Sequence, residues 1–187
     1  QRQMCIRDSG DAVGCAAGLC AALRQLGRTA YLLRNPDITE ANAVYAAPYW
    51  GPEDFVPDHV VAVDIAARSL FFPAAEAYFD RIDLAIDHHA SHRDFQRYLF
   101  LDADACATAL LIYDLLLCMG VEITPPIADC LYTGLATDTG CFKYGSTSPY
   151  AHRVAAMLME AGAQTESINR VMFDCKSRAR VELDQNE

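Results

Sequence analysis

Two short apolar runs, each ending in an acidic residue, constrain the fold of this chain more than any other feature. They are HVVAVD at residues 59–64 and LAID at residues 84–87. Runs of this length, rich in Val, Ile and Leu, are typical of strands buried on both faces, as in parallel sheets. Functional side chains of such sheets gather at the carboxyl ends of the strands. We therefore expect Asp64 and Asp87 to lie near the functional site.

Helical patterns alternate with these strands. Residues 51–58 carry two prolines and three acids, which predicts a loop, and residues 29–34 form a further candidate strand. This alternation predicts an α/β domain with a mostly parallel sheet and flanking helices. Helices are predicted at residues 11–26, 39–47, 73–79, 105–119, 125–137, 148–162 and 165–175.

Composition narrows the classes of function. A chain of 187 residues with 52% hydrophobic residues suits one domain with a real core. The formal net charge is −10 and no basic patch is visible, which argues against a long nucleic acid as partner. No apolar run reaches the roughly 18 residues of a membrane span. The start, QRQMCIRDS, lacks the apolar region of a signal peptide.

The chain has eight cysteines but no C-x-x-C pair. Cys20, Cys106, Cys118 and Cys130 stand in apolar stretches, where a reduced cysteine behaves as a small hydrophobic residue. The spacing gives little support to a thiolate metal site. We therefore predict free thiols and a reducing, cytoplasmic setting.

The densest chemical signal is Asp87-His88-His89, directly after the second apolar run. Neutral imidazole is a common ligand for transition metals, and a neighbouring carboxylate can orient it. Both rings can reach one cleft where a strand ends and turns into a loop. The alternative is a surface loop that happens to hold two histidines.

Three further acids strengthen the case for metal binding. Asp64 ends the first apolar run, and Asp138 follows a predicted helix between two threonines. Asp11 lies at the start of a predicted helix, where an acid is also a good cap. Carboxylates combined with imidazole suit Mn²⁺ or Mg²⁺. A carboxylate that bridges two ions would give a two-metal site.

Four motifs in order resemble those of the DHH phosphoesterases. This superfamily includes RecJ nucleases, family II inorganic pyrophosphatases, cyclic-di-AMP phosphodiesterases and nanoRNase/pAp phosphatases. Each motif alone is weak, but their order and spacing are specific, and the resemblance covers nearly all of residues 10–183. The motifs are GDAVG at 10–14, VAVDIA at 61–66, IDHHAS at 86–91 and GLATDTGCFKY at 134–144.

This resemblance implies a hydrolase that uses two metal ions, Mn²⁺ or alternatively Mg²⁺, to activate a water molecule against a phosphoester. Asp64 would bridge the two ions. His89 would face the substrate phosphate, and Asp87 would orient an imidazole. The implied metal ligands are Asp11, Asp64, His88 and Asp138.

The chain departs from the family pattern at both ends. The first family motif reads H-x-x-P-D before Gly10, but Ser9 stands at the place of that Asp and no histidine precedes Asp11. Residues 1–9 also lack the expected apolar strand, so we interpret them as foreign to the protein. The domain then covers residues 10–183, and residues 184–187 approach a C-terminal substrate-binding domain that is missing. We expect the printed chain to be catalytically impaired.

Several functions remain open at this point. STSPYAHR and FDCKSRAR are most similar to the nanoRNase/pAp phosphatase branch, whose substrates are short oligonucleotides and 3′-phosphoadenosine 5′-phosphate (pAp). One alternative is the catalytic domain of a cyclic-di-AMP phosphodiesterase. Another is a degenerate, metal-poor binding module. A RecJ-type nuclease or a pyrophosphatase fits less well, and a homodimer stays open.

Overall fold

The computed structural model describes residues 2–5 and 9–174. Its centre is a five-stranded sheet in which every neighbouring pair is parallel, in the order β2-β1-β3-β4-β5. This architecture confirms the predicted fold class. The strands are β1 (Arg2–Cys5), β2 (Ala30–Leu32), β3 (His59–Val63), β4 (Ile82–Asp87) and β5 (Tyr98–Leu101).

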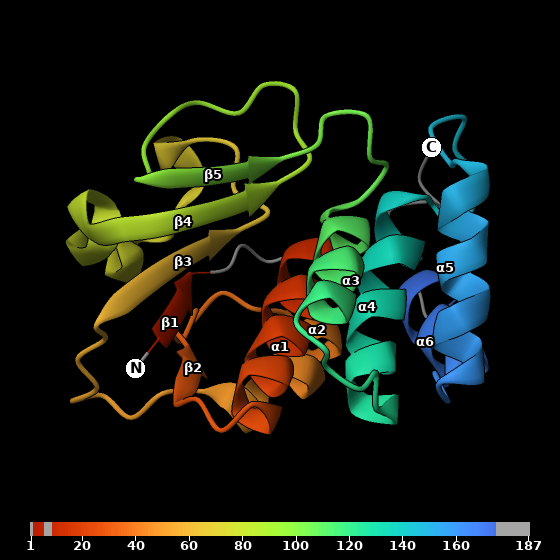
Figure 1. The fold of residues 1–187 in the computed structure, drawn as a ribbon, viewed down its shortest axis with the longest axis horizontal. Helices are drawn as coiled ribbons and strands as arrows, with labels where there is room; N and C mark the ends of the chain where they lie inside the picture. The colour runs from red at the N-terminus through yellow and green to blue at the C-terminus, as the bar shows by residue number, and fades with distance from the viewer. Residues whose placement is uncertain (1, 6–8, 175–187) are drawn as a thin grey trace, which may run out of the picture.

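The main helices are stacked on one side of this sheet, with α1 nearest to it and α5 farthest away (Figure 1). Short 3₁₀ helices follow α2 and precede β4, and a π-helical turn follows α6. The α-helices are α1 (Gly10–Gln25), α2 (Glu40–Ala46), α3 (Thr108–Cys118), α4 (Pro125–Asp138), α5 (Pro149–Glu160) and α6 (Thr165–Asn169). The 3₁₀ helices are Ala47–Tyr49, Arg68–Leu70 and Pro73–Arg81, and the π turn is Arg170–Asp174.

Successive side chains of β3 belong alternately to two hydrophobic cores. Val61 and Val63 belong to the large cluster between sheet and helices, whereas Val60 and Ala62 join a smaller cluster with Phe72. Because successive side chains of a strand point to opposite faces, a strand covered on both sides must be apolar throughout. This is why HVVAV shows no polar alternation.

Helices α1 and α4 approach each other closely because glycine stands at their contact. A Cβ atom on Gly14 would lie 2.2 Å from the carbonyl oxygen of Cys130, a distance that no side chain can tolerate. A Cβ on Gly134 would lie 2.5 Å from Oδ1 of Asp11. The close approach brings the start of α1 and the end of α4 to one place.

The expectation that no strand precedes Gly10 is wrong. Residues Arg2–Cys5 form β1, which pairs with both β2 and β3 and lies inside the sheet. Met4 is fully buried in the large core. Two neighbouring strands supply hydrogen bonds on both edges, and this tertiary pairing outweighs a weak local pattern.

The sequence reading also missed β5, the edge strand next to β4. Its four residues, YLFL, are all exposed, with Tyr98 58% and Phe100 38% accessible. An apolar run normally predicts burial, so a strand with exposed apolar side chains on a sheet edge breaks the rule used to find the others.

Other differences are small. Helix α3 begins at Thr108 rather than 105, α4 continues through Asp138, and residues 73–79 are 3₁₀ rather than α-helical. The last predicted helix changes to a π turn at Arg170, and its expected end at Cys175 lies outside the described residues. Within the described part of the chain, no helix is both long and apolar enough to cross a membrane.

Candidate metal centre

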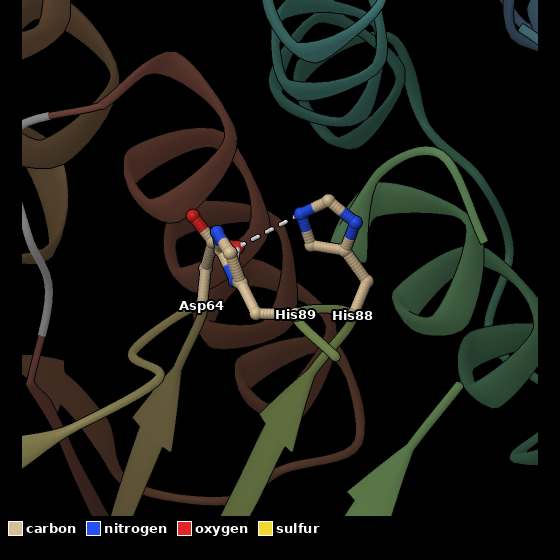
Figure 2. Close-up of side chains that lie close together, drawn as sticks. All are labelled: Asp64, His88 and His89. Atoms are coloured by element: carbon tan, nitrogen blue, oxygen red, sulfur yellow. Dashed lines mark ion pairs between the residues drawn. The ribbon is translucent and has the colours of Figure 1, made fainter. Parts of the chain in front are cut away.

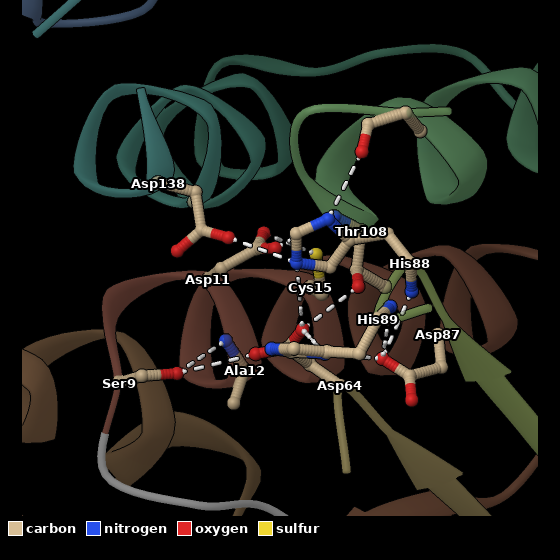
Figure 3. Close-up of polar contacts among 12 residues, drawn as sticks. Ser9, Asp11, Ala12, Cys15, Asp64, Asp87, His88, His89, Thr108 and Asp138 are labelled. Atoms are coloured by element: carbon tan, nitrogen blue, oxygen red, sulfur yellow. Dashed lines mark hydrogen bonds and ion pairs between the residues drawn. The ribbon is translucent and has the colours of Figure 1, made fainter. Parts of the chain in front are cut away.

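The site lies where the strand order reverses. The chain passes from β1 to β2 on one side of β1 and then to β3 on the other, and parallel sheets bind ligands at the carboxyl ends flanking such a reversal. Asp64 directly follows β3, and Asp87 is the last residue of β4. Asp11 lies in the first turn of α1, and Asp138 is the last residue of α4. Figure 3 shows these side chains converging.

His88 presents an unpaired nitrogen to this cluster. Its Nδ1 donates to the carbonyl oxygen of Ala105 at 3.0 Å, so in the neutral ring Nε2 carries the lone pair. Among the described residues, the buried Nε2 has no hydrogen-bond partner, and it lies 3.0 Å from Oδ2 of Asp138 and 3.7 Å from Oδ1 of Asp64. Figure 2 shows the ring directed at Asp64. A lone pair facing two carboxylates is unfavourable unless a proton or a cation lies between them.

The pKa values of these residues are shifted because several ionisable groups are buried close together. Burial, followed by the charges of Asp64 and Asp138, raises the pKa of Asp11 well above its usual value. Burial, followed by the charge of Asp138, raises the pKa of Asp64 to about 6. Burial opposes protonation of His88, but Asp138 and the carbonyl of Ala105 raise its pKa to about 9. A divalent cation would relieve this repulsion, so the donor set fits one.

Two hydroxyl groups hold the side chain of Asp64, whose backbone is in a left-handed conformation. Its φ of 58° is left-handed, a conformation that a non-glycine residue adopts at a cost of about 1–2 kcal/mol. Thr108 donates from Oγ1 to Oδ1 of Asp64 at 2.8 Å, and Ser9 donates from Oγ to Oδ2 at 3.3 Å. Strain of this kind is typical of functional positions that the surrounding structure over-determines.

Asp11 is fully buried and caps a helix other than its own. Its carboxylate accepts hydrogen bonds from the backbone N–H of Thr108 at 2.6 Å and of Ala109 at 3.1 Å. Ala107, at the start of α3, has no capping side chain. The cap of α1 is Ser9, whose Oγ accepts from the N–H of Ala12. The capping role considered for Asp11 is therefore real, but it serves α3.

Asp87 joins two imidazoles from a fully buried position. Its Oδ1 accepts from Nδ1 of His89 at 2.7 Å, and its Oδ2 accepts from Nδ1 of His92 at 2.6 Å. Although burial would raise the pKa of Asp87, the hydrogen bonds from His89 and His92 lower it. The bond to Asp87 in turn raises the pKa of His89.

The potential ligand atoms form two groups that share His88. One group holds Asp11, His88 and Asp138, and the other holds Asp64, His88 and His89, with the ligand atoms of each group within 4.8 Å of one another. All the residues singled out from the sequence lie at this one place. Four residues that support the site were not predicted from the sequence. They hydrogen-bond to Asp11, Asp64 or Asp87, and they are Ser9, Cys15, Thr108 and His92.

Comparisons with known proteins give a family match over most of the chain. The DHH family, N-terminal domain, matches residues 5–135. The chain is 34% identical over 175 residues to the bifunctional oligoribonuclease and PAP phosphatase NrnA of Thermus thermophilus, covering 92% of this chain and 53% of that protein. It is 28% identical over 134 residues to NrnA of Mycoplasma pneumoniae, covering 64% of this chain and 41% of that one. The chain thus spans about half the length of these relatives.

Two solved structures share the fold. An exopolyphosphatase-related protein from Bacteroides fragilis superposes with a TM-score of 0.85 at 21% identity, over 99% of this chain and 59% of that one. A putative family II inorganic pyrophosphatase from Methanococcus jannaschii gives 0.62 at 19% identity, over 91% and 60% of the two chains. With a family match over most of its length, the chain belongs to the DHH family.

Proposed function

We propose that this chain is the catalytic domain of a metal-dependent phosphoesterase that hydrolyses short oligonucleotides and pAp. The observation that carries the metal dependence is the buried Nε2 of His88, which has no hydrogen-bond partner and faces Asp138 and Asp64. The substrate class rests on the similarity to the NrnA proteins.

In this proposal the ligands are Asp11, Asp64, His88 and Asp138, and the preferred ion is Mn²⁺, with Mg²⁺ as the alternative. A bound ion supplies Lewis acidity, both to the phosphoryl oxygens and to the attacking water. The carbonyl of Ala105 keeps the proton of His88 on Nδ1, so that Nε2 is free to bind. Thr108 and Ser9 keep the two oxygens of Asp64 from rotating.

His89 meets the substrate phosphate in this proposal. Its Nδ1 donates to Asp87, which leaves Nε2 to approach a phosphoryl oxygen, and its side chain is 34% exposed. The raised pKa of His89 favours the charged ring, which would stabilise negative charge on the phosphate or donate a proton to the leaving oxygen. Because Nδ1 is committed to Asp87, we assign His89 to the substrate rather than to a metal ion.

The acidic chain suits a short substrate. The formal net charge of −10 would repel a long polyanion, whereas a di- or trinucleotide or pAp presents few phosphates, which bound cations can neutralise. We infer that charge and the ion-binding cluster together select short substrates. Since Arg2–Cys5 form β1, the proposal that residues 1–9 are foreign now rests on Ser9 and on the lack of a histidine before Asp11, and resequencing of the gene upstream of Gly10 tests it.

The test is hydrolysis by the purified chain in Mn²⁺, with a 5′-phosphorylated RNA dinucleotide, pAp, cyclic di-AMP and a 24-nucleotide RNA offered separately. Because the chain is expected to be impaired, we expect slow but measurable turnover of the first two, and loss of at least about 100-fold from that rate in Asp64→Ala and His88→Ala. Asp102→Ala, an exposed acid after β5, is the matched control and should keep full activity.

The other outcomes are equally clear. Preferred hydrolysis of cyclic di-AMP would move the chain to the phosphodiesterase branch. Preferred hydrolysis of the long RNA would contradict the argument from charge. Mn²⁺ binding without turnover of any substrate would support a binding module, and full turnover by Asp64→Ala would overturn the metal site itself.

A further inference from the structure

His92 is a buried histidine that lies outside the motifs carrying the family resemblance, and it was not among the predicted site residues. Its side chain is only 1% exposed, and its Nδ1 lies 2.6 Å from Oδ2 of Asp87. The chain reaches it by a turn in which the N–H of His92 donates to the carbonyl of His89. Phe95 packs on the ring, with 5.2 Å between centroids. Burial, hydrogen bonds and packing therefore fix the ring of His92 next to Asp87.

Both ring nitrogens of His92 face hydrogen-bond acceptors. Nε2 lies 3.2 Å from Oε1 of Gln96, and that oxygen also accepts the backbone N–H of Phe95 at 2.8 Å. Reversing the Gln96 amide would bring its NH₂ group against this N–H, so the oxygen must face His92. Asp87 is an acceptor for Nδ1. Nδ1 therefore donates to Asp87, and Gln96 holds the ring from its other side.

The two oxygens of Asp87 are supported differently. Oδ1 accepts from the backbone N–H groups of His88 and His89 and from the His89 ring. Among the hydrogen bonds of the described residues, Oδ2 receives one only from His92. Without His92, a fully buried carboxylate oxygen would lose its donor, and the carboxylate would be free to rotate toward other partners.

We propose that His92 is a positioning residue, which acts through Asp87 to hold the His89 ring with Nδ1 protonated and Nε2 turned toward the substrate. Gln96 holds the far side of the His92 ring. Oδ2 of the buried carboxylate is thus held by His92, which leaves Oδ1 to accept from the His89 ring. This proposal rests on the proposed function, in which His89 meets the substrate phosphate.

The test combines nitrogen NMR with kinetics on the full chain. Long-range ¹H–¹⁵N spectra of the metal-free wild type should show a hydrogen on Nδ1 of His92 and on Nδ1 of His89. His92→Leu keeps a similar volume without a donor, whereas His92→Asn can place its amide nitrogen near the position of Nδ1. In His92→Leu we expect His89 to exchange between tautomers and kcat to fall by about tenfold, with KM changed less than about twofold. His92→Asn should restore kcat to within about threefold of wild type.

Phe95→Leu is the matched control, because it loosens the packing around His92 without removing a hydrogen bond to Asp87. Its His89 spectrum should match that of wild type. A His92 ring without a hydrogen on Nδ1 in the wild-type spectrum would overturn the proposal, as would an unchanged His89 in a folded His92→Leu. If His92→Leu does not fold, the wild-type and His92→Asn spectra decide. The spectra need no turnover, so a failure of the proposed function would be seen separately as inactivity with the His89 arrangement intact.

Discussion

Nε2 of His88 lies 3.0 Å from Oδ2 of Asp138, an ion-pair distance that is favourable only when a proton or a cation lies between the two atoms. The proton of the ring is held on the far side by Ala105. The two residues belong to the end of β4 and the end of α4, so the fold itself brings a nitrogen lone pair against a carboxylate. A second proton on His88, or a cation, must complete this contact.

The metal-free chain should lose stability as the pH rises from 6 to 9. Folding raises the pKa of His88 from its ordinary 6.5 to about 9, so the folded state holds this proton more tightly. The resulting stability is complete below pH 6.5 and is lost as the pH passes 9. Asp64, raised from 3.8 to about 6, acts in the same direction at lower pH. Melting temperatures in EDTA should fall accordingly, and Mn²⁺ should restore them. His88→Asn should flatten the fall above pH 6.5, and a flat wild-type curve would contradict the raised pKa.

The chain should bind one Mn²⁺ tightly rather than two. Both groups of potential ligands contain His88, and the second also contains His89, which we assign to the substrate. Ser9 offers only a neutral hydroxyl beside Asp64. Titration calorimetry should give a stoichiometry near one. Ser9→Asp adds an anionic ligand next to Oδ2 of Asp64 and should tighten a second ion by at least about tenfold. Two tight ions in the unaltered chain would refute the argument from shared ligands.

Asp11 and Asp138 should differ in their effect on stability, although both are proposed ligands. Asp11→Ala leaves two backbone N–H groups at the start of α3 without an acceptor, at a cost of about 1–3 kcal/mol. Because burial raises the pKa of Asp11, removing its carboxyl group also relieves an unfavourable buried charge at neutral pH, so the loss should be measured near pH 4, where this relief is small. Asp138 is 28% exposed on its side chain and, among the described residues, accepts no backbone hydrogen bond at a helix start, so Asp138→Ala should cost less than Asp11→Ala even though it removes the partner that raises the pKa of His88. Urea unfolding in EDTA measures both, and equal stabilities would exclude the capping role.

All eight cysteines should react with a thiol reagent in denaturant without reductant. The six whose side chains the structure describes are free thiols. In the native state Cys118, which is exposed, should react first. Burial raises the pKa of Cys130 to about 12, so its thiolate is scarce and its reaction should wait for unfolding. Fewer than eight reactive thiols in denaturant would indicate disulfides or a bound soft metal.

Local patterns predicted the elements that carry local information. The period of apolar residues located α1 and α4, and the runs ending in Asp64 and Asp87 located β3 and β4. Because parallel strands end at one edge, these patterns also predicted which side chains meet. No local pattern marks β1, whose place depends on pairing with β2 and β3.

The supporting contacts of the site were not predictable in the same way. Asp11 bonds to the N–H of Thr108, 97 residues away, and Thr108 bonds to Asp64 across 44 residues. A threonine at the start of a helix carries no sign of such a partner. His92 lay five residues beyond Asp87, near enough to suspect, but only the turn after His89 brings its ring back to the carboxylate.

Because β5 is an edge strand, two copies of this chain could pair there, and the state of association would then depend on concentration. Charged residues flanking an apolar strand act as gatekeepers against runaway strand addition, and Arg97 and Asp102 stand at the two ends of Tyr98–Leu101. Their signs are opposite, however. Two copies meeting antiparallel about a two-fold axis would bring Arg97 of one near Asp102 of the other. The same charges that discourage disordered aggregation would therefore favour an ordered pair, and a dilute and a concentrated solution of this chain need not contain the same particle.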